Sequence, residues 1–288
     1  MKSVSPLSFK NPGEAIKAFK KGDFKGERVR AFPKGSEEFL NDFFSVLAKA
    51  MLKENFSRDE IIVQTVKYYD ELNTTLNSLF ERVYEWFTLA IPEASKMVEN
   101  PEKFYSVVSK VLGSADLVPS IKRELKIKEA YGGALTAADL ASLKSSLSFF
   151  ITVYKERDSV KKYIDDLVTE LAPNLAAVAT PQLGAKLMSV VGGLERLASV
   201  PASTIQVLGA EKALFRHLIK GTKPPKHGLI IQHPFVQGAG RKFKGKVARF
   251  LANKISLAAK VDFYGGDKNG SLGKAYYNEL KRRSEALK

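Results

Sequence analysis

The sequence predicts a mainly α-helical protein, with two long helices that form an antiparallel coiled-coil hairpin and a compact helical domain at the C-terminal end. Apolar residues recur in steps of three and four over two stretches of about 30 residues each. Proline residues and capping motifs mark the ends of both stretches. We therefore expect a short N-terminal region (1–56), a rod with a helical cap (57–172) and a C-terminal domain (173–288).

The N-terminal region divides into an arm and one helix. Residues 1–35 contain three prolines and four glycines but little apolar periodicity, which predicts a weakly structured arm. From Ser36, apolar residues recur at helical spacing as far as Asn55. Ser57 and Glu60 then match a capping box, the motif in which each residue bonds the backbone N–H of the other. A new helix should begin there.

The first long helix should end at Pro92, and Asn73 is the polar residue in its seam. The second should begin at the Thr136–Asp139 capping box and end at Pro173. About 45 residues with shorter helical patterns separate them and predict a helical cap. Such a hairpin can close within one chain, pair between two chains, or do both, and we expect self-association through it. The seam residues are Ile62, Val66, Tyr69, Asn73, Leu76, Phe80, Val83, Phe87 and Ala90, and then Leu140, Leu143, Leu147, Phe150, Tyr154, Ile164, Val168 and Leu171, with interruptions at Arg157 and Lys161.

Helix signals continue through the C-terminal domain. A Thr180 cap with Pro181 at the first position predicts a helix as far as Leu197. Further helices are expected over 203–220, ended by Gly221, over 244–261, ended near Gly265, and after Gly273. The segment 223–240 carries three prolines and should be a long loop or short extended pieces, with 229–231 the most strand-like run.

Composition limits the function. The 288 residues are 44% hydrophobic, which indicates a folded protein. The absence of cysteine excludes disulfides, thiolate metal sites and cysteine nucleophiles. No apolar run of about 18 residues exists and no secretory signal opens the chain, so we expect a soluble cytoplasmic protein that does not bind a membrane.

The net charge of +15 is concentrated in one segment. Residues 201–260 contain twelve basic residues and a single acid, Glu211, so they carry an excess of +11. This cluster predicts a polyanionic partner, with nucleic acid first and an anionic surface second. A solvated charged face is the alternative. The basic residues are Lys212, Arg216, Lys220, Lys223, Lys226, Arg241, Lys242, Lys244, Lys246, Arg249, Lys254 and Lys260.

Two motifs invite a catalytic interpretation. Residues Gly240–Val247 match the phosphate-binding pattern G-x-x-x-x-G-K, but Val247 stands where a hydroxyl must reach magnesium. The same residues suit the basic start of a nucleic-acid-binding helix. The three histidines, His217, His227 and His233, match no common zinc pattern, and His227 is a candidate for stacking on a base or contacting a phosphate. We expect no enzyme activity, no metal and no cofactor.

Three separated blocks then resemble a known family. They read PASTIQVLGAEKALFR from Pro201, PPKHGLIIQHP from Pro224 and KGKVARFLANKISLAAKVD from Lys244. Together they resemble the Nop domain of the archaeal core proteins of box C/D RNA-guided methylation ribonucleoproteins. The resemblance extends backward through the two long helices and covers roughly residues 57–287.

The resemblance implies a function and a partner set. Family members dimerise through the long helices, and their Nop domain grips a kink-turn guide RNA together with a small kink-turn-binding ribosomal-type protein. Methyl transfer belongs to fibrillarin, a separate subunit. By the same resemblance, Gly209, Ala210, Glu211 and Lys212 meet RNA and kink-turn protein together, Arg216 contacts the guide RNA, and Lys244, Lys246 and Arg249 form the basic helix. The remaining candidates for this interface are Gln206, Lys223, Lys226, His227, Arg241 and Lys242.

Glu211 has two interpretations: it accepts a hydrogen bond from the partner or orients Lys212, or it is an ordinary residue on a helix surface. One departure from the family concerns the N-terminal end. About 56 residues precede the first long helix, fewer than the family's fibrillarin-binding domain needs, which weakens the expectation of fibrillarin binding. Three alternative functions stay open: a splicing-factor relative that binds a kink-turn without recruiting fibrillarin, a nucleotide-dependent enzyme that uses Gly240–Val247, and a purely structural coiled-coil protein.

Overall fold

The computed structural model describes residues 37–54, 57–114, 116–129 and 131–286, and the chain divides into two compact units, Met1–Ser57 and Arg58–Lys288. In the first unit the description covers one helix, α2 (Glu37–Glu54), which confirms the helix predicted after Ser36. The predicted arm at 1–35 lies outside the described residues. Every regular element in the described part of the chain is helical, so the predicted mainly α fold is confirmed.

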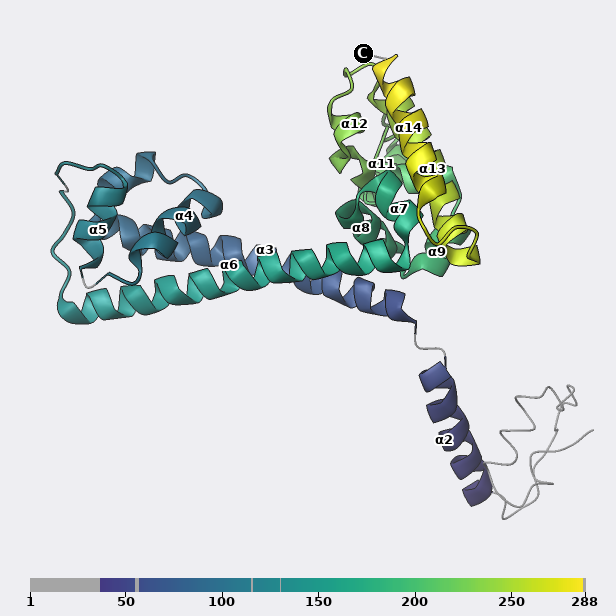
Figure 1. The fold of residues 1–288 in the computed structure, drawn as a ribbon, viewed down its shortest axis with the longest axis horizontal. Helices are drawn as coiled ribbons and strands as arrows, with labels where there is room; N and C mark the ends of the chain where they lie inside the picture. Colours follow the sequence, from purple (N-terminus) through teal and green to yellow (C-terminus); the bar gives the residue numbers. More distant parts are fainter. Residues whose placement is uncertain (1–36, 55–56, 115, 130, 287–288) are drawn as a thin grey trace, which may run out of the picture. The chain divides into compact units, whose positions relative to one another are not determined.

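The second unit is built on two long helices, α3 (Arg58–Ala90) and α6 (Ala137–Leu171), which lie side by side and run in opposite directions (Figure 1). Thr136 Oγ1 accepts from the Asp139 N–H at 3.2 Å, and Asp139 Oδ2 accepts from the Thr136 N–H at 2.9 Å. This confirms the predicted capping box. The Asn73 side chain donates to the Tyr69 carbonyl at 2.9 Å, so the polar residue in the seam is satisfied within its own helix.

A small aromatic core closes one end of the hairpin. Here η2 (Pro92–Lys96), α4 (Pro101–Val111) and α5 (Leu117–Glu124) form the predicted helical cap. Phe104 lies fully buried at its centre, with ring centroids 5.3 Å from Phe87 and 5.1 Å from Phe150 in edge-on contacts. Beside this core, Arg157 covers the Tyr154 ring at 4.1 Å. The seam is interrupted there because the guanidinium caps the aromatic core.

The C-terminal elements pack around α13 (Lys244–Tyr264), whose inner face includes the buried Leu251, Ala252 and Ile255. The same core includes Ile62 and Val66 of α3 and residues 160–168 of α6, so the rod helices enter it, and the boundary at residue 173 stays a prediction. The other helices of this part of the chain are α7 (Pro173–Ala179), α8 (Pro181–Val191), α9 (Leu194–Ser199), α10 (Ala202–Val207), α11 (Glu211–Lys220), η3 (Leu229–Gln232), α12 (Pro234–Gln237) and α14 (Ser271–Glu285).

Several local predictions need correction. The helix expected as far as Leu197 breaks at Gly192 and Gly193, whose φ angles are +90° and +126°. There the Asp59 carboxylate accepts from the Leu194 N–H at 2.6 Å and takes the space of a Cβ on Gly193, 2.7 Å from its Oδ2. Thr180 precedes α8 as expected, but its side chain forms no cap.

The other corrections concern 229–231 and Gly273. The strand-like run is a 3-10 turn, η3, which leads into α12. Gly273 lies inside α14 rather than before it. A glycine is needed at this position because a Cβ would stand 2.6 Å from the Asn174 backbone. Asn174 is fully buried; it donates to Asp262 Oδ1 at 2.8 Å and accepts from the Gly273 N–H at 2.7 Å. This side chain therefore ties α7 to both α13 and α14.

Candidate nucleic-acid interface

Two segments, the junction of α10 and α11 (206–211) and the stretch that leads into η3 (226–229), are joined by hydrogen bonds and form the centre of the candidate site. The Gln206 side chain donates to the Lys226 carbonyl at 2.7 Å, and the Gln206 carbonyl accepts from the Gly228 N–H at 2.8 Å. The Leu229 N–H donates to the Leu208 carbonyl at 2.6 Å. The structure therefore brings together residues that belong to two separate sequence blocks.

Two glycines allow this close approach. A Cβ on Gly228 would lie 1.9 Å from the Leu208 carbonyl oxygen, a backbone atom that cannot move aside alone. Gly209 has a φ of +81°, and a Cβ there would lie 2.5 Å from the Leu229 side chain. Only glycine fits both positions without strain, because it alone lacks a Cβ and adopts positive φ readily.

Glu211 has a contact within the chain. Its Oε1 accepts from the Gly209 N–H at 2.6 Å, at the first position of α11. A carboxylate at a helix N-terminus is favourable, because it faces unpaired N–H groups and the positive end of the helix dipole. Glu211 therefore stabilises the bend at Gly209, a role that the sequence does not reveal.

The first turn of α13 lies against the second loop. A Cβ on Gly245 would lie 3.7 Å from the Lys226 Cβ, so these two segments are in contact. The pKa of His227 is lowered by partial burial first, and then by the nearby positive charges of Lys244 and Lys226. Both effects favour the neutral form of His227, and the lysine charges place Lys244 and Lys226 near its ring. This basic cluster (Lys226, His227, Lys244) sits beside the exposed Lys246 and Arg249.

The remaining predicted residues lie at the surface near these segments in the chain. Ala210 is half-buried at the position before α11. Lys212 and Arg216 are exposed on α11, Lys223 is exposed in the following loop, and Arg241 and Lys242 are exposed in the turn before α13. Their side chains are available to a polyanionic partner.

The nucleotide-binding alternative is not supported by this geometry. Residues 240–243 form a turn between α12 and α13, and no strand precedes them within the described chain. Val247, at the position that needs a hydroxyl, is 2% exposed and belongs to the core. Nor do three His, Asp or Glu side chains gather as a potential metal site among the described residues.

Comparison with known proteins identifies the family. A family model described as "Nop: snoRNA binding domain, fibrillarin" matches residues 68–286. An uncharacterized NOP5 family protein of Methanocaldococcus jannaschii is 40% identical over 219 residues, which cover 72% of this chain and 53% of that protein. The chain belongs to the Nop family. The resemblance inferred from the three sequence blocks is confirmed.

Other Nop relatives agree. Nucleolar protein 56 of Schizosaccharomyces pombe is 32% identical over 254 residues, 82% of this chain and 51% of the relative. Nucleolar protein 56 of Mus musculus is also 32% identical, over 82% of this chain and 43% of the relative. The Nop chain thus spans about half the length of the curated relatives it matches. A crystal structure of a fibrillarin/Nop5p complex aligns with a TM-score of 0.48 and 24% identity, covering 95% of this chain and 92% of that chain.

One feature of the Nop chain escaped sequence analysis. Helix α11 has no buried residue, and its apolar side chains Phe215, Leu218 and Ile219 are 62%, 68% and 78% exposed. Their spacing is that of a core-facing stripe, so the sequence alone suggests burial. The half-buried residues of α11 are Ala213, Leu214 and His217. One feature of the sequence does indicate exposure: the apolar residues adjoin Lys212 and Arg216, two basic residues that lie four positions apart and therefore on one face of the helix.

The other two histidines of the Nop chain make local contacts. His217 contacts the Thr222 carbonyl through Nδ1 and helps close the turn after α11. His233 is 2% exposed, and its Nδ1 accepts from the Phe235 N–H at 3.2 Å as the cap of α12. Burial lowers the pKa of His233 to about 4. Both therefore have structural roles.

Helices that could cross a membrane are not found: within the described residues, none combines the necessary length and apolar character.

Proposed function

We propose that this chain is a non-catalytic scaffold of a box C/D ribonucleoprotein, which binds kink-turn guide RNA together with a kink-turn protein and bridges to the fibrillarin 2'-O-methyltransferase. The observation that carries the proposal is the exposed apolar face of helix α11. This helix presents uncovered apolar side chains, and it follows directly on the 206–211 segment, which hydrogen bonds join to the loop that carries Lys226 and His227. A surface of this kind suits a partner pair of protein and RNA better than either one alone.

The RNA side of the proposal rests on charge and position. Lys226, Lys244 and Lys246 lie around the first turn of α13, and their positive charges favour an RNA phosphate. Lys212 and Arg216 extend the positive surface along α11. Contacts of this kind position an RNA backbone without reading its sequence, so we expect affinity to depend strongly on salt and weakly on sequence.

The protein side rests on the apolar face of α11. Phe215, Leu218 and Ile219 form a contiguous stripe because they lie three and four residues apart. Burying such side chains in a partner contributes more to binding than the exposed charges at the rim. In this proposal the apolar stripe binds the kink-turn protein and the basic cluster binds the RNA. The bend at Gly209–Lys212 contacts both partners.

Fibrillarin enters the proposal through the family, whose description pairs snoRNA binding with fibrillarin. A splicing-factor relative would bind the kink-turn complex without fibrillarin, so a pull-down with purified fibrillarin separates the two. Self-association through the rod is also part of the proposal, because Tyr68, Phe149 and Tyr163 are exposed apolar residues on α3 and α6. A monomeric mass for the full chain in light scattering at micromolar concentration would remove that part.

The decisive experiment is a gel-shift titration with kink-turn RNA, in the presence and absence of the kink-turn protein. We expect a stable complex only when both partners are present. Leu218→Gln should weaken the ternary complex roughly 10-fold, since a central apolar contact is lost without a change of charge. Leu272→Gln is the matched control, because Leu272 is an exposed leucine on α14, outside the proposed surface. Equal loss in both variants would contradict the assignment of α11.

A further inference from the structure

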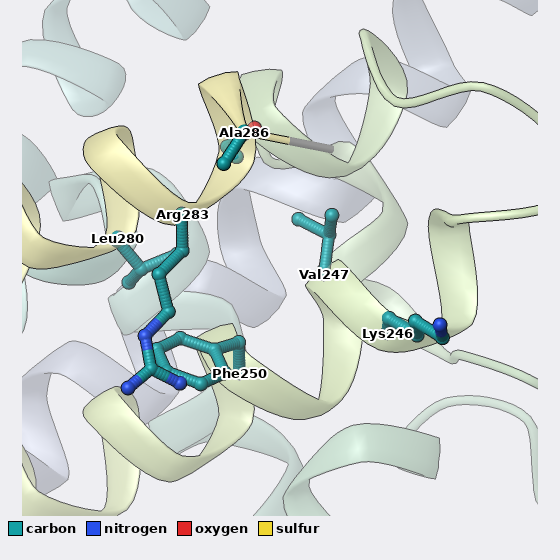
Figure 2. A pocket seen from close by; sticks show the side chains of 7 residues that line it. Lys246, Val247, Phe250, Leu280, Arg283 and Ala286 are labelled. Atoms are coloured by element: carbon teal, nitrogen blue, oxygen red, sulfur yellow. The ribbon is translucent and has the colours of Figure 1, made fainter. Parts of the chain in front are cut away.

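A pocket of about 340 Å³ lies between α13 and the end of α14 (Figure 2). Val247, Phe250 and Leu280 give it apolar walls, and Ala286 lies at one end. This volume is at the small end of the range of about 300–1,000 Å³ for ligand pockets, so it suits one small ring system rather than a peptide segment. None of the functions described above accounts for this pocket.

Arg283 makes one side of the pocket a stacking surface. Its guanidinium carbon lies 3.8 Å from the centroid of the Phe250 ring, and Figure 2 shows the two groups stacked. The side chain is still 58% exposed, so the outer face of the guanidinium is open. Its ion pair with Glu279 is long, at 3.5 Å, and Glu279 also bonds Lys254. Arg283 is therefore held flat but only weakly neutralised.

The surroundings of the pocket favour an anionic ligand. Residues 241–249 and 279–286 together contain eight basic residues and two acids, Glu279 and Glu285. Lys246 belongs both to the pocket wall and to the first turn of α13, next to the basic cluster. Ser284 adds a hydroxyl that can bond a polar ring edge. A flat ring that carries a phosphate meets all of these features, and a nucleotide is such a molecule.

We propose that this pocket receives the base of one unpaired nucleotide of the bound RNA, stacked on the open face of Arg283 with its phosphate near Lys246. Bases splayed out of RNA commonly stack on arginine planes and aromatic rings. The inference rests on the proposed RNA binding and adds to it a second point of contact. It also predicts that an RNA must place an unpaired nucleotide within reach of the end of α14.

The test combines pocket variants with a scan of abasic RNAs, in which each unpaired nucleotide of the kink-turn RNA loses its base in turn. All titrations include the kink-turn protein. Ala286→Trp fills the pocket without changing charge, and Ala275→Trp is its control on the exposed side of α14. Arg283→Leu removes the stacking plane, and Arg282→Leu is its control, with the same loss of charge on an exposed neighbour.

We expect one abasic position to weaken binding by wild type on the order of 10-fold, the usual effect of losing one stacked base. Ala286→Trp and Arg283→Leu should weaken binding of intact RNA by a similar factor and be insensitive to that abasic position. Ala275→Trp should stay within about two-fold of wild type, since exposed substitutions away from a contact have small effects. Arg282→Leu should stay sensitive to that abasic position, because it loses a charge near the pocket but not the stacking plane.

Two results would overturn the pocket assignment while leaving the proposed function intact. Either no abasic position shows a loss that the pocket variants abolish, or these variants weaken every RNA equally, as they would if a protein segment occupied the pocket. Failure of the wild-type chain to form a ternary complex with intact RNA would instead overturn the proposed function and the pocket assignment together. Circular dichroism and thermal melting of each variant separate these results from misfolding, and Arg283→Leu serves if Ala286→Trp does not fold.

Discussion

Replacing Lys244 and Lys246 together by alanine should weaken RNA binding to the same degree for all sequences and lower its salt dependence. Both residues lie in the first turn of α13, and neither is paired with an acidic side chain in the part of the chain that the structure describes. Each is therefore available to neutralise one phosphate. Because contacts to phosphate carry no sequence information, the loss should not depend on the guide.

The magnitude follows from counting phosphates. Each phosphate neutralised by a protein contributes about 0.7–0.9 to the slope of log K against log salt, so two lost contacts lower the slope by about 1.4–1.8. Between 50 and 200 mM salt, a four-fold change, the ratio of wild-type to variant affinity should then fall about 7- to 12-fold. The variant is most impaired at low salt and approaches wild type at high salt.

The measurement is a series of titrations of the ternary complex at four or five salt concentrations. Lys155→Ala with Lys162→Ala is the matched control, because these lysines are exposed on α6 and their removal changes the net charge equally. The control should change the slope by much less than one unit. An unchanged slope in the α13 variant, or an equal change in the α6 control, would show that neither lysine of α13 contacts a phosphate.

Three further predictions follow from burial and charge near the interface. His233→Asn should remove a pH dependence of the free energy of unfolding. Because the pKa of His233 is lowered to about 4, the neutral ring stabilises the wild-type fold fully above pH 6.5, and about 3 kcal/mol of this stability is lost as the pH falls toward 4. Urea unfolding of both proteins over this pH range measures the loss, and identical pH profiles would refute the prediction. Lys244→Ala should raise the pKa of His227 in an NMR titration, because the lysine charge lowers it, whereas Lys223→Ala should leave it unchanged. Gly228→Ala should destabilise the protein by about 1–3 kcal/mol in thermal unfolding, since its Cβ would meet the Leu208 carbonyl, whereas Gly240→Ala, with its nearest contact at 3.8 Å, should change stability by less than about 0.5 kcal/mol.

Local signals were sufficient to predict the ends of most helices. The capping box at Thr136 and the αL glycines Gly221 and Gly265 act through hydrogen bonds and torsion angles within a few residues. Such signals can be read without knowing the fold. The break at Gly192–Gly193 could not be predicted in the same way, because it depends on Asp59, which lies more than 130 residues earlier in the chain.

The candidate site was predicted in part. Charge and family resemblance pointed to Lys226, His227 and Lys244, which the structure brings together. The role of Glu211 toward Gly209 and the open stacking face of Arg283 depend on tertiary geometry, and no spacing in the sequence encodes them. Nor does an apolar stripe on a helix reveal whether its own domain covers it, which is why the exposure of α11 came only from the structure.

The uninterrupted course of α6 limits how this protein can change in length. The helix contributes Phe150 to the aromatic core of the cap and Ile164 to the core around α13, so both cores are fixed to one rigid axis. An insertion in α6 between the two cores would rotate one core relative to the other by about 100° per inserted residue. An insertion of about seven residues is close to two full turns, so it nearly restores the original orientation of the two cores about the helix axis. Because α3 lies alongside in the opposite direction, it would need a matching insertion. We therefore expect viable length variants of the rod to come as paired insertions or deletions in both helices, in steps of about 10 Å.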